Sequence, residues 1–503
     1  MTEKEALSYK RIIATTSLVG FANAIGYLLE LIKIKIAAIL FGTTGIALFS
    51  SYQLLLKIIG TFTVEGLRNS GIHALSTLNK PNDINETNSL FANLRRKSII
   101  LSAIASIGII ACFELLNSTL FNNHLSTKSI ILTAISIFIL SLAGVNTSTL
   151  QGLRKTKEVA ASVIISSIAA TITSLVAFKI YGIDGIVISF TLTALASLFT
   201  THYFLIKLDI RAEPSRQVYK TSHKIELFTI NALVVASGLL TYLIDSLIRT
   251  IIINAHGFQQ AGLYYAALSL ASLYGGFIIG AMGVDYYPRI SACINNSKDA
   301  NHAINQQIEF GVLLGTPGIV FTIVFSNDAL RYIYTEEFSI AGTALKYFAI
   351  GVFAKIVSWP LGFALLATKK AKAYLIVEVA AAALYLLLST TLITRFGISG
   401  AGYAYLANFS IYSAIVYIVL KNTIGFEPAA TAAKTIGIGL TLVLSALFSM
   451  LADSATASII VGTALTLAAS IFSARGIVIR LRHTHWLTKT ILASKLRFLL
   501  LIP

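Results

Sequence analysis

The chain has 503 residues, of which 56% are hydrophobic and 12% are charged, and its formal net charge is +17. A soluble globular protein would have roughly a quarter charged residues, so this composition excludes a soluble enzyme and a disordered chain. The two cysteines are too few for a disulfide framework or a metal cluster, and we expect no cofactor and no metal site.

Apolar stretches recur along the whole chain and predict an all-α polytopic membrane protein with about 14 transmembrane helices. In chain order, the expected spans are residues 12–41, 44–67, 98–118, 129–152, 158–180, 184–206, 225–254, 260–285, 306–326, 340–367, 373–395, 400–420, 431–451 and 456–474. Most Lys and Arg residues fall in alternate loops and in the termini, which is the positive-inside pattern. The net charge therefore indicates topology, with both termini in the cytoplasm, and we expect no nucleic-acid partner.

An internal repeat occurs at a constant offset of 215 residues. The sequence Tyr27-Leu28-Leu29-Glu30 returns as Tyr242-Leu243-Ile244-Asp245, Gly42 returns as Gly257, and Gly182 returns as Gly397. The offset spans six predicted helices, so both copies enter the membrane in the same direction and form two six-helix lobes in parallel repeat. The expected parts are an N-terminal lobe at 1–207, a cytoplasmic linker at 208–224, a C-terminal lobe at 225–421, two extra transmembrane helices at 422–475 and a basic amphipathic cytoplasmic tail at 476–503.

Charged residues inside the spans are the candidate functional positions, because a charge at the centre of a transmembrane helix costs about 2.5–3.5 kcal/mol on insertion scales. Lys57 and Lys355 lie in the middle of their spans with no acidic residue three or four positions away. We expect both to line a polar cavity. Glu65 and Arg68 predict an ion pair, and Glu309 and Glu378 predict partly solvated charges near helix ends.

Acidic and basic residues also lie one turn apart at matching places of the two copies. Glu30 precedes Lys33, and Asp245 precedes Arg249. These residues are either self-neutralising pairs, or basic groups that reach the cavity with acidic groups that couple ions. Lys35 lies about 200° around the helix from Lys33, so the two cannot point toward the same centre.

Tyrosines near these charges are candidates for contact with sugars. They are Tyr27, Tyr52, Tyr242, Tyr264 and Tyr274. For each ring the alternative is packing in the core or in the interfacial aromatic belt.

Three segments resemble bacterial O-antigen flippases of the Wzx type. They are Phe41-Gly42-Thr43-Thr44-Gly45-Ile46-Ala47-Leu48, Gly66-Leu67-Arg68-Asn69-Ser70-Gly71-Ile72 and Met282-Gly283-Val284-Asp285-Tyr286-Tyr287-Pro288-Arg289-Ile290. This family belongs to the superfamily that also holds MATE exporters and lipid II flippases. The two extra helices depart from the pattern of O-antigen flippases and are more familiar among lipid II flippases.

The resemblance implies twin lobes around a V-shaped cavity in the bacterial inner membrane, and a transporter rather than an enzyme. It implies that an oligosaccharide on undecaprenyl diphosphate crosses from the cytoplasmic to the periplasmic leaflet by alternating access. A diphosphate needs cations, and the candidates are Lys57, Arg249, Lys355, Lys33 and Lys35. The expected partners are the lipid-linked substrate, membrane lipids and other polysaccharide assembly proteins.

Two other functions remain open at the level of sequence. In an ion-coupled multidrug exporter of the MATE type, Glu30 and Asp245 would be the working groups. Unpaired lysines at mid-membrane depth argue against this function because they would repel a cationic drug. A non-transporting scaffold for polysaccharide assembly is the third function, but a scaffold has no need for charges at this depth.

Overall fold

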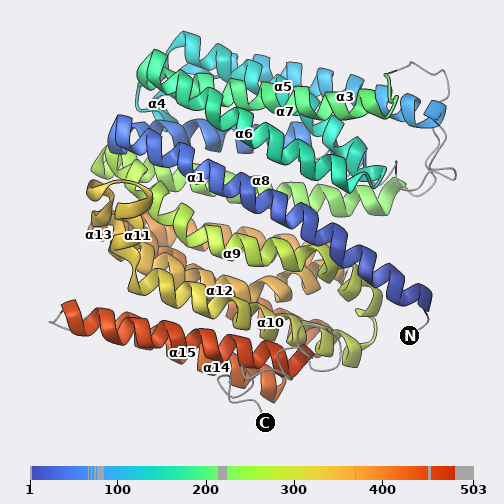
Figure 1. Ribbon diagram of the computed structural model, residues 1–503. Helices are drawn as coiled ribbons and strands as arrows, with labels where there is room; N and C mark the ends of the chain where they lie inside the picture. Colours follow the sequence, from blue (N-terminus) through green and yellow to red (C-terminus); the bar gives the residue numbers. More distant parts are fainter. Residues whose placement is uncertain are drawn as a thin grey trace. The chain divides into compact units, whose positions relative to one another are not determined.

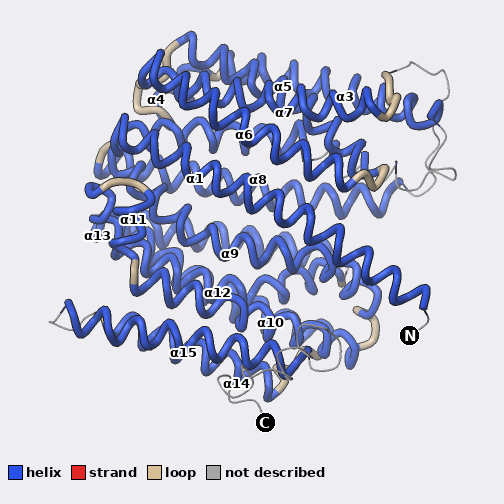
Figure 2. Tube along the Cα trace, viewed as in Figure 1, coloured by secondary structure: helices blue, strands red, loops and turns tan. Residues whose placement is uncertain are grey.

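The computed structural model describes residues 3–65, 67–68, 71–72, 75, 84–212, 224–368, 370–450 and 455–481. These residues form helices joined by short connections, and they contain no β-strand (Figure 2). The chain divides into two compact units, residues 1–262 with 333–335, and residues 263–332 with 336–503. An all-α fold is what the apolar sequence predicts, because helices satisfy their own backbone groups inside a membrane.

The first unit is built from helices that run side by side. In chain order they are α1 (Glu3–Gly60), the π-helical turn η1 (Thr61–Glu65), α3 (Ile84–Ala111), α4 (Phe113–Leu120), α5 (Thr127–Gly152), α6 (Thr156–Tyr181), the short 3-10 turn η2 (Gly182–Asp184), α7 (Gly185–Lys207) and α8 (Lys224–His256). Figure 1 shows α3, α5, α6 and α7 as neighbours, and α1 packs against α6.

The second unit contains most of α9 (Phe258–Cys293), which begins in the first unit. The elements that follow are α10 (Ser297–Val324), α11 (Ser326–Ile333), the 3-10 helix η3 (Glu336–Ala341), α12 (Gly342–Ala367), α13 (Ala371–Ile424), α14 (Ala430–Ser449) and α15 (Ala455–Leu481). α12 packs along α13, and α10 contacts α12, α14 and α15.

The two long helices α1 and α13 are each two helices joined at a glycine. Gly42 breaks α1 at φ 60°, and Gly397 breaks α13 at φ 61°. Glycine adopts this left-handed region without the steric cost that a Cβ brings. The breaks lie between the predicted spans 12–41 and 44–67, and between 373–395 and 400–420, so these divisions are confirmed.

The structure repeats itself at the offset found in the sequence. α5 (Thr127–Gly152) and α12 (Gly342–Ala367) begin and end 215 residues apart. Lys155 precedes α6 with φ −81° and ψ 62°, and Lys370 precedes α13 with φ −84° and ψ 66°. Gly182 and Gly257 have positive φ like their partners Gly397 and Gly42. Equal backbone conformations at equal spacing confirm a parallel structural repeat.

Membrane-spanning helices account for most of the described residues. Nine helical stretches are long and apolar enough to cross a bilayer, and two of these, 52 and 53 residues long, contain the breaks at Gly182 and Gly397. α3 and α4 pass the same test of length and apolarity only as a pair, and they are bent by 69° from each other, as in a broken span or a re-entrant loop. The predicted single span 98–118 is therefore incomplete, because the helix begins at Ile84 and turns at Cys112.

The two extra C-terminal helices pack on α10 through small residues. A Cβ at Gly439 would lie 2.9 Å from Val312 Cγ1, and a Cβ at Gly476 would lie 2.5 Å from Leu313 Cδ2. Small residues allow this approach between helices in a membrane. α15 continues to Leu481, past the predicted end at 474, so the start of the expected tail at 476 is helical. Residues 482–503 lie outside the described residues.

The segment between α13 and α14 is held by two asparagines of α10. Asn301 donates to Gly425 O at 3.1 Å and accepts from Glu427 N at 2.8 Å. Asn305 donates to Glu427 O at 3.0 Å and accepts from Ala429 N at 2.8 Å. Each amide thus pairs with the backbone as a neighbouring strand would, which fixes the entry into α14.

The compact units divide the chain later than the predicted linker at 208–224. α8 lies in the first unit, where it contacts α1, η1 and α4. The placement of 225–254 at the start of the second lobe depends on the repeat and stays a prediction. Residues 213–223 of the linker lie outside the described residues.

Candidate functional site

Lys33 is a buried cation on α1. Its side chain is 4% exposed, and its Nζ lies 2.9 Å from Glu30 Oε2 one turn earlier. The ammonium also lies 5.5 Å from the centre of the Phe49 ring and 5.8 Å from that of Phe190. An acid and two ring faces therefore compensate this charge within the helix packing.

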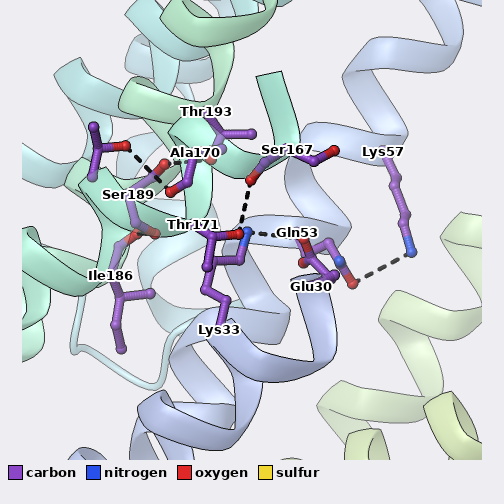
Figure 3. A network of polar contacts seen from close by, with 11 residues as sticks. Glu30, Lys33, Gln53, Lys57, Ser167, Ala170, Thr171, Ile186, Ser189 and Thr193 are labelled. Atoms are coloured by element: carbon purple, nitrogen blue, oxygen red, sulfur yellow. Dashed lines mark hydrogen bonds and ion pairs between the residues drawn. The ribbon is translucent and has the colours of Figure 1, made fainter. Parts of the chain in front are cut away.

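Lys57 lies in the second half of α1 and has an exposed side chain. Its Nζ is 3.4 Å from Gln53 Oε1, one turn earlier on the same helix. The charges of Asp245 and Glu30 also act on this ammonium. Figure 3 shows Glu30 and Gln53 lying between the ammonium groups of Lys33 and Lys57. A long amide contact leaves most of the hydrogen-bonding capacity of Lys57 available.

Lys35 and Arg249 donate to backbone carbonyls. Lys35 Nζ donates to Tyr334 O, and Arg249 Nη2 donates to Ala47 O. Arg249 is 3% exposed, and Lys35 is half-buried. The sequence correctly places Lys33 and Lys35 on different sides of α1, because Lys33 pairs with Glu30 whereas Lys35 reaches the segment after α11.

The acidic candidates of the first unit differ in how they are used. Glu30 keeps 34% of its side chain exposed while it binds Lys33. Asp245 on α8 is half-buried. The ion pair expected between Glu65 and Arg68 is present at 2.9 Å, and Arg68 Nε also donates to Gln151 Oε1 at 3.3 Å.

The second unit has its own polar cluster around α12 and α13. Lys355 is half-buried, and its Nζ lies 5.2 Å from the centre of the Phe409 ring. Tyr412 donates its hydroxyl to Glu378 Oε1 at 2.7 Å, and the charge of Lys355 acts on Glu378. Sequence spacing placed no acid near Lys355, and the structure brings one from α13. Glu378 is half-buried, so the partly solvated charge expected there also takes part in a contact between the two halves of α13.

The five candidate tyrosines divide into packed and accessible rings. Tyr52 is 4% exposed and packs on Phe121, while Tyr264 is 3% exposed and packs on Phe348. Tyr274 lies against Gly318 and donates its hydroxyl to Leu314 O at 2.6 Å.

Among the five, the rings open to contact are Tyr27, which is 54% exposed, Tyr274, which is 36% exposed, and Tyr242, which is half-buried. Tyr27 and Tyr242 belong to the same motif of the repeat, one on α1 and one on α8.

One ion pair escaped the sequence-based prediction. Arg480 of α15 donates from Nε to Glu309 Oε2 at 2.6 Å and from Nη2 to Thr435 Oγ1 at 3.0 Å. The Glu309 side chain is 10% exposed, so it is not the solvated charge that we expected. Its partner lies 171 positions away, and the unexplained acid on an apolar helix was the only signal for it.

These features can be compared with known proteins. A family model described as "Polysaccharide biosynthesis protein" matches residues 49–342. The chain belongs to the polysaccharide biosynthesis protein family. This family member is 19% identical over 383 residues to the lipid III flippase of Escherichia coli (strain K12), a match that covers 75% of this chain and 90% of that protein. The Shigella flexneri lipid III flippase matches equally.

Solved structures share the fold of this polysaccharide biosynthesis protein. The inward-facing conformation of a multidrug resistance MATE family transporter of the MOP superfamily has a TM-score of 0.69 at 13% identity, covering 80% of this chain and 94% of that one. The lipid II flippase MurJ in an inward closed conformation has a TM-score of 0.66 at 18% identity, covering 92% and 99%. The expected fold class is thus confirmed.

Proposed function

We propose that this protein is a flippase that moves an undecaprenyl-diphosphate-linked oligosaccharide, an O-antigen unit or a related surface glycan, from the cytoplasmic to the periplasmic leaflet. Transport by alternating access through a cationic cavity, without catalysis, is the activity proposed. Its place is the bacterial inner membrane, with both termini in the cytoplasm and with other polysaccharide assembly proteins as partners. The family membership and the flippases among the relatives support this class of substrate.

The observation that carries the proposal is Lys57. It is an exposed cation within the predicted span 44–67, with a long contact to Gln53 and with the charges of Asp245 and Glu30 acting on its ammonium. A lysine facing lipid at this depth would be costly, so a water-filled cavity is the environment that fits it. A diphosphate that enters the cavity would find a cation with donors to spare.

Lys355 is the second cation that we assign to substrate. It is half-buried against Phe409, and the nearby Glu378 is engaged by the Tyr412 hydroxyl. That hydrogen bond occupies the acid and leaves the ammonium better able to attract an anion. We assign Lys33 a structural role, because Glu30 and two aromatic rings already compensate its charge.

The test is a set of charge-neutralising substitutions scored by surface glycan per amount of protein in the membrane. Lys57→Gln and Lys355→Gln should each lower surface glycan about tenfold or more, as expected for a lost charge-assisted contact, while the protein remains abundant. Lys57→Arg should keep partial activity because a cation remains. Lys179→Gln, at the exposed end of α6, is the matched control and should transport normally.

The competing function is an ion-coupled multidrug exporter of the MATE type, in which Glu30 and Asp245 act on the coupling ion. The commitment of Glu30 to Lys33 disfavours it. Normal transport of glycan by both Lys57→Gln and Lys355→Gln would reject the cationic-cavity mechanism and favour the multidrug exporter.

A further inference from the structure

Two hydrogen bonds of the first unit are related by the repeat. Lys35 on α1 donates to Tyr334 O, and the Thr250 hydroxyl on α8 is shared between Thr119 O at 3.2 Å and Ser246 O of its own helix at 3.0 Å. Thr250 stands 215 positions after Lys35, and Tyr334 stands 215 positions after Thr119. Each repeat therefore offers a donor from its first helix to the same carbonyl position of the other repeat.

The accepting carbonyls lie where a helix needs outside donors. Thr119 is in the last turn of α4 (Phe113–Leu120), and Tyr334 follows the last residue of α11 (Ser326–Ile333). The final carbonyls of a helix have no partner within that helix, and a cation is favourable at this negative end. Lys35 and Thr250 thus act as C-terminal caps supplied across the repeat.

A close backbone contact lies beside these bonds. A Cβ at Gly262 would overlap the Thr43 carbonyl and would lie 3.1 Å from Ala47 N. Ala47 and Gly262 are themselves 215 positions apart, so equivalent residues meet each other. This is the signature of a two-fold contact between α1 and the start of α9. Arg249 adds its bond to Ala47 O at the same place.

We propose that these contacts form a repeat latch, a gate that closes α1 against α8 and the start of α9 and opens during the transport cycle. Its residues are Lys35, Ala47, Thr119, Thr250, Gly262 and Tyr334, with Arg249 as a positioning residue. Lys35 and Arg249 are then gate residues and not ligands of the substrate. The repeat latch does not depend on which substrate the protein carries.

The chemistry of the repeat latch suits a contact that opens and recloses. Ala47 O also accepts the hydroxyls of Ser50 at 2.9 Å and Ser51 at 3.1 Å, so it keeps partners when Arg249 leaves. The carbonyls at the ends of α4 and α11 can take water in the open state. Gly262 presents no side chain to interlock, so separation meets little steric resistance.

The two halves of the repeat latch differ in strength. Lys35 supplies a charged donor and Thr250 a neutral one, and hydrogen bonds to charged groups are about twice as strong. Loss of Lys35 should therefore open the latch further than loss of Thr250. A purely structural pair of caps would change stability without this ordered change in access.

The test measures access to a single cysteine at the edge of the repeat latch. Phe258 is 6% exposed, and its ring centre lies 5.0 Å from that of His124. Phe258→Cys is introduced into a form with Cys112→Ser and Cys293→Ser, and the purified protein is reacted with a water-soluble maleimide. Lys35→Met should raise the labelling rate about tenfold and Thr250→Val about threefold, the shifts that such lost hydrogen bonds produce in a two-state equilibrium.

Two matched controls separate opening from general loosening. Thr241→Val removes a hydroxyl that donates to Ser237 O within α8 at 2.9 Å, and it should leave labelling unchanged. Gly262→Val should wedge the latch open, whereas Gly276→Val on the same helix α9 meets open space and should not. Unchanged labelling in both Lys35→Met and Thr250→Val, or an equal rise in the controls, would overturn the proposal. If Gly262→Val fails to fold, the two donor variants still decide it.

Discussion

Gly182 and Gly397 turn the chain through the same left-handed conformation, at φ 57° and 61°, between the last two helices of each repeat. Three residues later, a Cβ at Gly185 would overlap Ala177 O, and a Cβ at Gly400 would overlap Leu392 O. Ala177 and Leu392 are again 215 positions apart. The same glycine turn is thus built twice, and equivalent substitutions should have equal effects.

Gly182→Ala and Gly397→Ala should each destabilise the protein by about 1–2 kcal/mol, because alanine is strained in the left-handed region. Thermal unfolding of the purified protein in detergent measures the loss. Gly437→Ala is the control, since Gly437 lies inside α14 with no neighbour within 4 Å, and it should be neutral or slightly stabilising. Equal midpoints for all three variants would contradict the strained turns.

Glu30→Gln should lower the amount of folded protein, because it leaves the buried Lys33 ammonium without its acid. Breaking a buried pair costs about 3–5 kcal/mol, and the Glu30→Gln, Lys33→Gln double variant should recover abundance. Glu65→Gln is the comparison, because it breaks the ion pair with Arg68, in which Glu65 is 44% exposed and Arg68 is 37% exposed. Loss of this exposed pair should lower the stability of the protein by at most about 1 kcal/mol. Quantitative immunoblotting of membranes gives the answer, and a double variant no more abundant than Glu30→Gln would reject the pairing argument.

Arg480→Met should loosen α15 from α10. The substitution leaves the Glu309 carboxylate, which is 10% exposed, without its cation. The stability of the protein should fall by about 2–3 kcal/mol. Arg475→Met, an exposed position of the same helix, should have little effect. Limited proteolysis of the C-terminal helices and the unfolding midpoint are the measurements. Rescue by Glu309→Gln in the Arg480→Met background is expected, and its absence would mean that the pair is not what holds α15.

Reporter fusions test the topology. Fusions after Lys157 and Lys372 should report the cytoplasm, and fusions at Gly182 and Gly397 should report the periplasm, because the basic loops stay inside. Equivalent positions of the repeat must give equal results. A disagreement between Gly182 and Gly397 would be incompatible with a parallel repeat.

The sequence predicted the features that depend on local pattern. The breaks at Gly42 and Gly397, the span pairs on either side of them and the Glu30–Lys33 spacing all depend on residues close in the chain. The repeat strengthened these predictions, because each motif appears twice. The apolar lengths alone were enough to assign the fold class.

Features that depend on packing between segments far apart in the chain could not be predicted from the sequence. The sequence could not say that Arg480 meets Glu309, or that Glu378 meets Tyr412, because nothing in helical periodicity specifies which helices touch. It also could not separate the buried Tyr52 from the exposed Tyr27. The bend at Cys112 has no proline beside it, and Gly108, one turn earlier, lies inside the apolar stretch from which a single span was predicted.

The hydrogen bonds from Asn301 and Asn305 to the segment that leads into α14 limit how this protein can be shortened. A chain cut after Ile424 would lose the carbonyls and amides at 425–429 that both side chains bind. Two amides on α10 would then lose these backbone partners, next to a Glu309 that has also lost Arg480. The last two helices are therefore not a removable module, and a minimal twelve-helix version would require new residues on α10 before it could be made.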